Sequence, residues 1–143
     1  MGPTEQIAVR AFRAGDAAPT LRLMRQLAAF EGYLEAFAPT EENLRQHGTG
    51  DAARFHALLA VAGKEEEVVG VAVLVEIPWT FDLRPTLMLK ELFVDQRARG
   101  RGVGRALMTA VARHSLALGA PRVEWKVLPE NTRAQAFYAE LGG

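Results

Sequence analysis

Cysteine, net charge and long hydrophobic runs are what this sequence lacks, and each absence excludes a class of protein. With no cysteine among 143 residues, the chain can form no disulfide framework, no thiolate nucleophile and no zinc–cysteine site. Its 17 basic and 17 acidic residues cancel, which argues against a nucleic-acid binder, because such proteins bind by neutralising phosphates. The longest apolar run, residues 68–75, is far shorter than the roughly 18 residues that a membrane span needs. We therefore expect neither a nucleic-acid nor a membrane partner.

The length and the start of the chain set further expectations. A chain of 143 residues is large enough for one core but too small for two, so residues 1–143 are expected to form a single domain. No signal peptide precedes Gln6, and the expected localisation is cytoplasmic. The three histidines have no metal-ligand spacing, so no metal site is predicted.

Residues 86–118 form the stretch around which the chain is organised. A dense apolar run at 86–94 is typical of a strand that is covered on both faces. A glycine-rich, basic turn follows, and from Val103 to Leu118 the apolar residues recur with helical spacing. A buried strand therefore leads into a basic turn, which opens a helix.

That turn has the features of a pyrophosphate-binding site. Glycines let backbone come close to a ligand, and the first amides of a helix have no internal partners and favour negative charge. The spacing fits neither the dinucleotide fingerprint Gly-x-Gly-x-x-Gly nor the triphosphate loop that ends in Gly-Lys-Ser/Thr. What remains is Arg99-x-x-Gly102-x-Gly104, and the competing interpretation is a solvated loop or a nucleic-acid contact. Four arginines crowd the turn: Arg97, Arg99, Arg101 and Arg105.

The whole chain predicts a mixed α/β fold in which helices pack on one sheet. Thr40 and Asn131 are expected to cap helices, and Gly32 and Gly119 to end them. The expected strands are residues 7–12, 55–61, 68–77, 86–94 and 122–128, and the expected helices are 16–31, 41–47, 103–118 and 132–140.

Two motifs carry a resemblance to a known family. Arg99-x-x-Gly102-x-Gly104 resembles the acetyl-CoA-binding motif Gln/Arg-x-x-Gly-x-Gly/Ala of the GNAT superfamily of N-acetyltransferases. Residues 131–138 are similar to its second signature, Asn-x-x-Ala-x-x-Phe-Tyr. The resemblance covers nearly the whole chain and implies the GNAT fold, with a largely antiparallel central sheet. Stretches at 23–31, 40–44, 69–72 and 89–94 look closest to the diamine branch, which contains the spermidine/spermine and thialysine acetyltransferases.

The sequence departs from that branch in three places. Lys90-Glu91 stands where the branch usually has two adjacent acids, which weakens the case for a polyamine substrate. Glu140 replaces a basic residue that often reaches the CoA phosphate. The family pattern also continues past Gly142 or Gly143 with two more strands. We therefore expect the native polypeptide to continue about 20 residues further, or a second copy of the chain to cover the sheet edge, as in the family's frequent homodimers.

The resemblance implies a set of cofactor and substrate contacts. Backbone groups of residues 92–94 would pair with the pantetheine arm of acetyl-CoA, and one N–H there would serve the carbonyl oxygen. Glu31 is a candidate for attracting a cationic amine, and Trp79 lies in a loop that either covers the pocket or packs on the domain's own edge. The predicted cofactor-binding residues are Leu92, Phe93, Val94, Arg99, Gly100, Arg101, Gly102, Val103, Gly104, Arg105 and Asn131.

Two residues are predicted to move protons. Tyr138 would protonate the departing thiolate, since a phenol with a pKa of about 10 remains a donor at neutral pH. The alternative is that Tyr138 only packs, with its hydroxyl at the rim of the core. Glu91 is an acid within an apolar strand, where burial raises its pKa and suits it to act as a base, directly or through water. Its alternative is an ion pair with Lys90 or a nearby arginine.

These residues predict an acetyl-CoA-dependent N-acetyltransferase. The acceptor is expected to be a small primary amine, polyamine- or amino-acid-like, acetylated by direct transfer in a ternary complex. A protein or peptide lysine acetyltransferase on the same fold is the first alternative. A CoA-binding sensor without turnover is the second.

Overall fold

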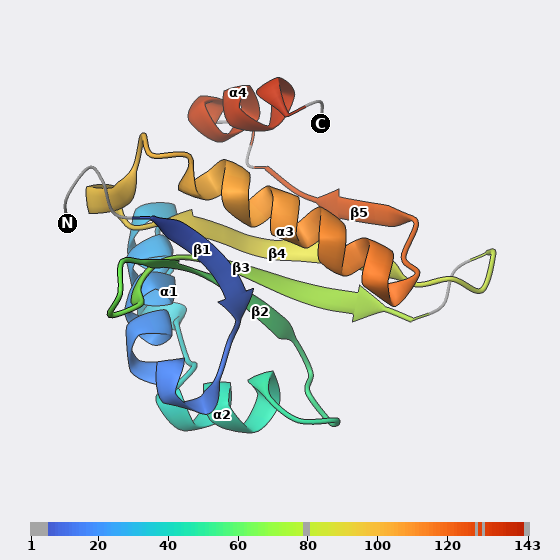
Figure 1. Cartoon of the computed structure of the whole chain (residues 1–143), viewed down its shortest axis with the longest axis horizontal. Coiled ribbons are helices and arrows are strands. Elements are labelled where there is room, and N and C mark those ends of the chain that lie inside the picture. The colour runs from blue at the N-terminus through green and yellow to red at the C-terminus, as the bar shows by residue number, and fades with distance from the viewer. Residues whose placement is uncertain (1–5, 79–80, 128, 130, 142–143) are drawn as a thin grey trace.

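In the computed structural model, described over residues 6–78, 81–127, 129 and 131–141, five strands and four α-helices follow one another in the predicted order (Figure 1). Trp79, Leu128, Gly142 and Gly143 lie outside the described residues. The strands are β1 (Ile7–Ala11), β2 (His56–Ala62), β3 (Glu67–Ile77), β4 (Thr86–Val94) and β5 (Arg122–Trp125). The helices are α1 (Ala17–Glu31), α2 (Glu41–Gly48), α3 (Val103–Leu118) and α4 (Thr132–Glu140).

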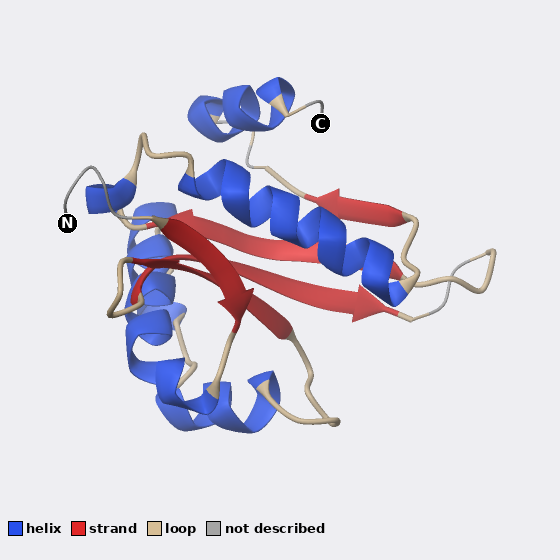
Figure 2. Ribbon diagram, viewed as in Figure 1, coloured by secondary structure: helices blue, strands red, loops and turns tan. Residues whose placement is uncertain are grey.

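The five strands form one sheet in the order β1-β2-β3-β4-β5 (Figure 2). The pairs β1–β2, β2–β3 and β3–β4 are antiparallel, and β5 runs parallel to β4. This confirms the predicted mixed, largely antiparallel sheet. The strand predicted at 122–128 is shorter than expected, because among the described residues β5 pairs with β4 only as far as Trp125 opposite Leu89.

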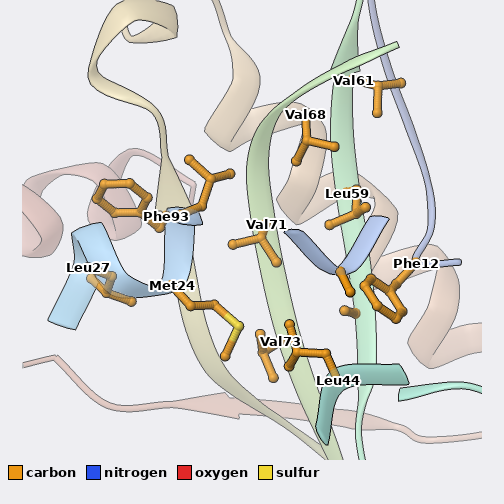
Figure 3. Close-up of a cluster of buried hydrophobic side chains, with 13 residues drawn as sticks. Phe12, Met24, Leu27, Leu44, Leu59, Val61, Val68, Val71, Val73 and Phe93 are labelled. Atoms are coloured by element: carbon orange, nitrogen blue, oxygen red, sulfur yellow. The ribbon is translucent and has the colours of Figure 1, made fainter. Parts of the chain in front are cut away.

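The helices cover both faces of the sheet (Figure 1), which is why β2 and β3 are apolar on both sides. Helices α1 and α2 bury one face in a cluster that includes Met24, Leu44 and Phe93 (Figure 3). Helix α3 covers the other face, where Leu107 and Val111 pack on the sheet. Among the described residues, none of the helices has both the length and the apolar character that a membrane crossing requires.

A bulge in β4 decides which side chains face which helix. Val73 of β3 pairs with Glu91, but the next residue, Leu74, pairs with Leu89, so Lys90 is an extra residue on β4. Because strand side chains alternate, an extra residue reverses the alternation beyond it. Leu89 therefore packs in the cluster under α3, whereas Phe93 packs in the cluster under α1. Glu91 shares the face of Phe93 and is directed to the α1 side.

Candidate active site

A cleft of about 480 Å³ opens where the end of α1, the second half of β4, the turn after it and α4 meet. Most of the predicted cofactor contacts line it, and Arg101 does not. The predicted residues among its lining are Leu92, Phe93, Val94, Arg99, Gly100, Gly102, Val103, Gly104, Arg105, Asn131 and Tyr138.

The cleft runs along an edge of β4 that β5 leaves open. In the described chain the β4–β5 ladder ends at Leu89, so the residues of β4 beyond it have no β5 partner. The amide of Asp95 points to β3, where it donates to the Val69 carbonyl at 2.8 Å. Since alternate residues direct their backbone groups to opposite edges, Leu92 and Val94 direct theirs to the open edge. The Val94 carbonyl accepts a hydrogen bond there from Arg99 Nε at 3.3 Å.

The glycine turn has the backbone that its sequence predicted. Gly100 and Gly102 have φ of +80° and +77°, the left-handed region that L side chains seldom adopt. Gly102 is the N-cap of α3, and a Cβ placed on it would meet nothing within 4 Å, so open space lies above the first turn of the helix. The first amides of α3 therefore face an open cradle of the kind that accepts an anion.

Gly104 has a different function from its neighbours in the turn. A Cβ on Gly104 would lie 3.1 Å from the ring of Phe137. The absence of a side chain therefore lets α4 pack on the first turn of α3. This contact brings the second signature, on α4, against the first.

The arginines of the turn divide into structural and available groups. Arg97 is occupied by Asp95 and Glu67, at 3.1 and 2.9 Å, and Asp95 also binds Arg22 of α1. This network holds the turn against α1. Within the described residues, Arg105 forms no ion pair, and it lines the cleft.

Arg133 is a cleft residue that sequence reasoning missed. It lines the cleft from the first turn of α4 and, like Arg105, has no ion pair among the described residues. Its only signal in the sequence was its place two residues after Asn131, inside the second signature. In the part of the chain that the structure describes, Arg105 and Arg133 thus both line the cleft without an ion pair, whereas Glu140 lines it with the opposite charge.

Tyr138 lies in the cleft on α4, whose start is fixed by Asn131. Asn131 Oδ1 accepts a hydrogen bond from the Ala134 amide at 3.1 Å, which confirms the predicted cap. The half-buried Tyr138 ring stacks on Trp125, with centroids 5.0 Å apart and planes inclined by 28°. Burial raises the pKa of Tyr138, and the negative charge of Glu31 raises it further. The phenol therefore keeps its proton at neutral pH.

Glu91 lies beside the cleft rather than in its lining, on the α1 side of the sheet. Its Oε2 is buried and has no hydrogen-bond partner among the described residues. Burial raises the pKa of Glu91, as does the charge of Glu31, while Lys90 and the Tyr33 hydroxyl act in the opposite direction. No ion pair in the described part of the chain joins Glu91 to Lys90 or to an arginine, so the geometry does not support the alternative.

Glu31 affects both of the residues that are predicted to move protons. It is the last residue of α1, exposed to solvent, and its charge raises the pKa of both Glu91 and Tyr138. Trp79, the other predicted substrate contact, lies outside the described residues. The described residues hold no group of three or more His, Asp or Glu side chains arranged to bind a metal ion.

Comparison with known proteins agrees with this geometry. The family model described as "Acetyltransferase (GNAT) family" matches residues 21–143. A thialysine N-epsilon-acetyltransferase from Bos taurus is 30% identical over 142 residues, which cover 95% of this chain and 83% of that protein. A spermidine/spermine N(1)-acetyltransferase-like protein from Homo sapiens is 26% identical over 94% of this chain and 20% of its own length.

Solved structures show the same fold. A crystal structure of an aminoglycoside acetyltransferase from an uncultured soil metagenomic sample, in complex with trehalose, superposes with a TM-score of 0.79 at 19% identity. The match covers 94% of this chain and 86% of that one. The chain therefore belongs to the acetyltransferase (GNAT) family and is an acetyl-CoA-dependent N-acetyltransferase.

Proposed function

We propose that this enzyme transfers the acetyl group of acetyl-CoA directly to a small primary amine, polyamine- or amino-acid-like, in a ternary complex. One observation carries the proposal. A single cleft brings together the glycine turn with its free cations, the open edge of β4 and the protonated phenol of Tyr138. The name of the bovine relative, a thialysine acetyltransferase, supports an amino-acid-like amine as the acceptor.

The residues of the cleft fit acetyl-CoA. Its pyrophosphate suits the first amides of α3, where Gly102 leaves open space and Arg105 and Arg133 supply positive charge. The pantetheine arm suits the open edge of β4, where backbone groups of Leu92 and Val94 can pair with its amides as a strand would. When bound, acetyl-CoA supplies the activated acetyl group.

The protein's own groups then stabilise the developing charge and accept and donate protons during the transfer. An N–H at the open edge of β4 stabilises the oxyanion that forms when the amine nitrogen attacks the thioester carbonyl. Glu91 takes the proton that the amine loses, and its raised pKa brings it closer to the pH at which a base is effective. Tyr138 gives its proton to the sulfur as the carbon–sulfur bond breaks, and solvent reprotonates the phenolate.

Carboxylates select the acceptor. Glu31 at the end of α1 and Glu91 on β4 are close enough for Glu31 to raise the pKa of Glu91, so together they favour a cationic amine at that point. Lys90 is exposed on the adjacent bulge and places a positive charge where the diamine branch usually has an acid. We therefore place amino-acid-like amines ahead of long polyamines among the substrates.

An amine panel that follows free CoA thiol tests the proposal. Lysine, thialysine, ornithine, spermidine and a lysine-containing peptide are each mixed with acetyl-CoA and the enzyme. Thiol release with a free small amine supports the proposal. Release with the peptide alone would identify a protein or peptide lysine acetyltransferase, and CoA binding without release from any amine would identify a sensor. Either of these results would overturn it.

A further inference from the structure

Two histidines that the proposed function does not use lie against each other between α3 and the sheet. The rings of His56, at the start of β2, and His114, in the second half of α3, have centroids 5.3 Å apart and planes inclined by 55°. Both residues are half-buried, and Nε2 of His114 is buried with no hydrogen-bond partner among the described residues. A buried nitrogen of this kind has no acceptor to stabilise it once it carries a proton.

The register of the sheet explains why the two rings meet. Leu58, two residues after His56, packs in the cluster under α3, so His56 is directed to the same face of the sheet. Leu74, which pairs with His56 on β3, packs there as well, and the exposed Glu76 follows two residues later on that face. Helix α3 covers this face and places His114 against His56. The two histidines, here called the histidine pair, therefore form a contact between α3 and the start of β2.

The surroundings of His114 are otherwise apolar. On α3, the residues three and four positions from it carry no charge: Ala110, Val111, Ala117 and Leu118. The strands β1, β4 and β5 contribute apolar residues to the cluster under α3, among them Ile7, Leu87, Leu89 and Val123. The titratable groups that act on His114 are His56 from β2 and Glu76 from β3.

We propose that the histidine pair is an acid-sensitive contact, which holds the second half of α3 on β2 while His114 is neutral and opens when His114 takes up a proton. That proton places a charge at a buried nitrogen without an acceptor, and solvating the charge requires the helix to move from the sheet. The second half of α3 leads through Gly119 to β5, whereas the glycine turn lies at the other end of the helix. Acid therefore loosens the corner between α3 and β5. The proposal is independent of the transfer reaction.

The direction of the pH effect follows from the burial of His114. Burial lowers the pKa of His114, the charge of His56 lowers it further, and Glu76 acts in the opposite direction. Because the folded pKa lies below the unfolded value of 6.5, the unfolded chain takes up the proton more readily. The stability that neutral His114 contributes is therefore present above the unfolded value, and it is lost as the pH falls from there toward the folded pKa.

Substitution of His114 tests the proposal through the pH dependence of stability. His114→Phe keeps a ring against His56 and removes the titrating group, and His114→Gln removes it with a smaller side chain. Between pH 8 and pH 5.5 the melting temperature of the wild type should fall about 3–5 °C further than that of either variant. The matched control is His47→Gln, at the end of α2, which should follow the wild type. A wild-type pH dependence in the folded variants at position 114 would overturn the proposal.

Two measurements on the unsubstituted protein test the contact directly. Proton NMR of the histidine Cε1–H signals should show His114 titrating below the unfolded value of 6.5, and a pKa at or above that value would contradict the proposal. Amide hydrogen exchange, corrected for the intrinsic effect of pH, should locate the change. From pH 8 to pH 5.5 the protection of residues 114–118 should fall about tenfold more than that of residues 105–109. Equal losses along α3 would show that acid does not release its second half.

Discussion

Tyr138 lies in an environment that favours its protonated form. Its ring is half buried against Trp125, and burial and the nearby Glu31 both raise the pKa of the hydroxyl. A phenol whose pKa lies above neutral still carries the proton that a departing sulfur would need. Neither the stacking on Trp125 nor the effect of Glu31 is visible in the second signature itself.

Replacing Tyr138 by phenylalanine should separate proton donation from packing. The substitution keeps the ring on Trp125, so acetyl-CoA binding should be nearly unchanged. The turnover rate should fall by about 10² to 10⁴, the usual contribution of positioned acid catalysis. Steady-state kinetics with the best amine of the panel, together with calorimetric titration of CoA, measures both quantities. A wild-type rate in this variant would mean that Tyr138 only packs.

Gly102 allows a test of the predicted pyrophosphate cradle. Asparagine tolerates positive φ better than most residues, so Gly102→Asn should fold while its side chain enters the open space above α3. We expect CoA affinity to fall at least about tenfold. The matched control is Gly50→Asn, because Gly50 has a φ of +80° and equally open surroundings in the turn after α2.

Calorimetric titration of CoA into both glycine variants, with melting temperatures recorded in parallel, gives the comparison. The two variants should show similar small losses of stability, and Gly102→Asn alone should lose affinity. Equal CoA affinities in folded samples of the two would show that the pyrophosphate binds elsewhere.

At the level of elements, local sequence signals predicted most of the fold. The helix-ending glycines at 32 and 119 and the caps at Thr40 and Asn131 are short-range features, and the structure has each of them at the predicted residue. The strand–turn–helix unit at 86–118 is predicted almost to the residue, because its apolar spacing changes abruptly from strand to helix.

Features that depend on pairing between distant residues were not predictable in the same way. The β4 bulge arises because Val73 and Leu74 of β3 pair with Glu91 and Leu89 and leave Lys90 without a partner on β3. No property of Lys90 itself predicts this. The bulge in turn decides that Glu91 faces the α1 side of the sheet. The end of the β4–β5 ladder at Leu89, which opens the edge beside the cleft, is likewise a property of two strands and not of one. The lining of the cleft was therefore largely predictable from the sequence, whereas the side of the sheet on which Glu91 lies was not.

Helix α3 lines the cleft with its first turn and packs on the sheet along one face, and that packing can be tested by itself. Leu107 is fully buried under the sheet, whereas Leu116 on the same helix is 78% exposed. Leu107→Ala should lower the free energy of unfolding by about 2–5 kcal/mol, the usual cost of a core leucine. Leu116→Ala should change it by less than about 0.5 kcal/mol. Urea unfolding followed by circular dichroism measures both, and equal losses would contradict the assignment of α3's buried face.

For the molecule as a whole, the homodimer stays a prediction. It concerns the edge of β5, which in the described residues pairs on one side only. Light scattering of the purified protein would detect it.

The acid sensitivity of folding is a property of the whole molecule that two buried aspartates predict. Two hydrogen bonds from the Arg10 guanidinium, at 2.8 and 3.0 Å, lower the pKa of Asp16. The Arg13 amide donates a third at 2.7 Å, which lowers it further. Burial alone would raise the pKa of Asp95, but hydrogen bonds from Arg97 and Arg22 lower it overall. A pKa that is lower in the folded state means that the unfolded chain binds protons more readily. Both aspartates therefore stabilise the fold above the unfolded value of 3.8, and that contribution is lost as the pH falls through their folded pKa values.

Asp16→Asn isolates the contribution of the first aspartate. At pH 7 the variant should unfold about 2 kcal/mol more easily than the wild type, since it loses hydrogen bonds between charged groups. The difference should shrink as the pH falls below the unfolded value of 3.8, because protonation of the unfolded chain then removes the advantage of the ionised wild-type carboxyl. Asp51→Asn, at an exposed turn position, is the control and should leave the free energy of unfolding unchanged at both pH values. Denaturant unfolding at about pH 7 and about pH 3 provides the comparison. A stability difference that stayed the same at both pH values would show that Asp16 stabilises the fold by packing rather than by its charge.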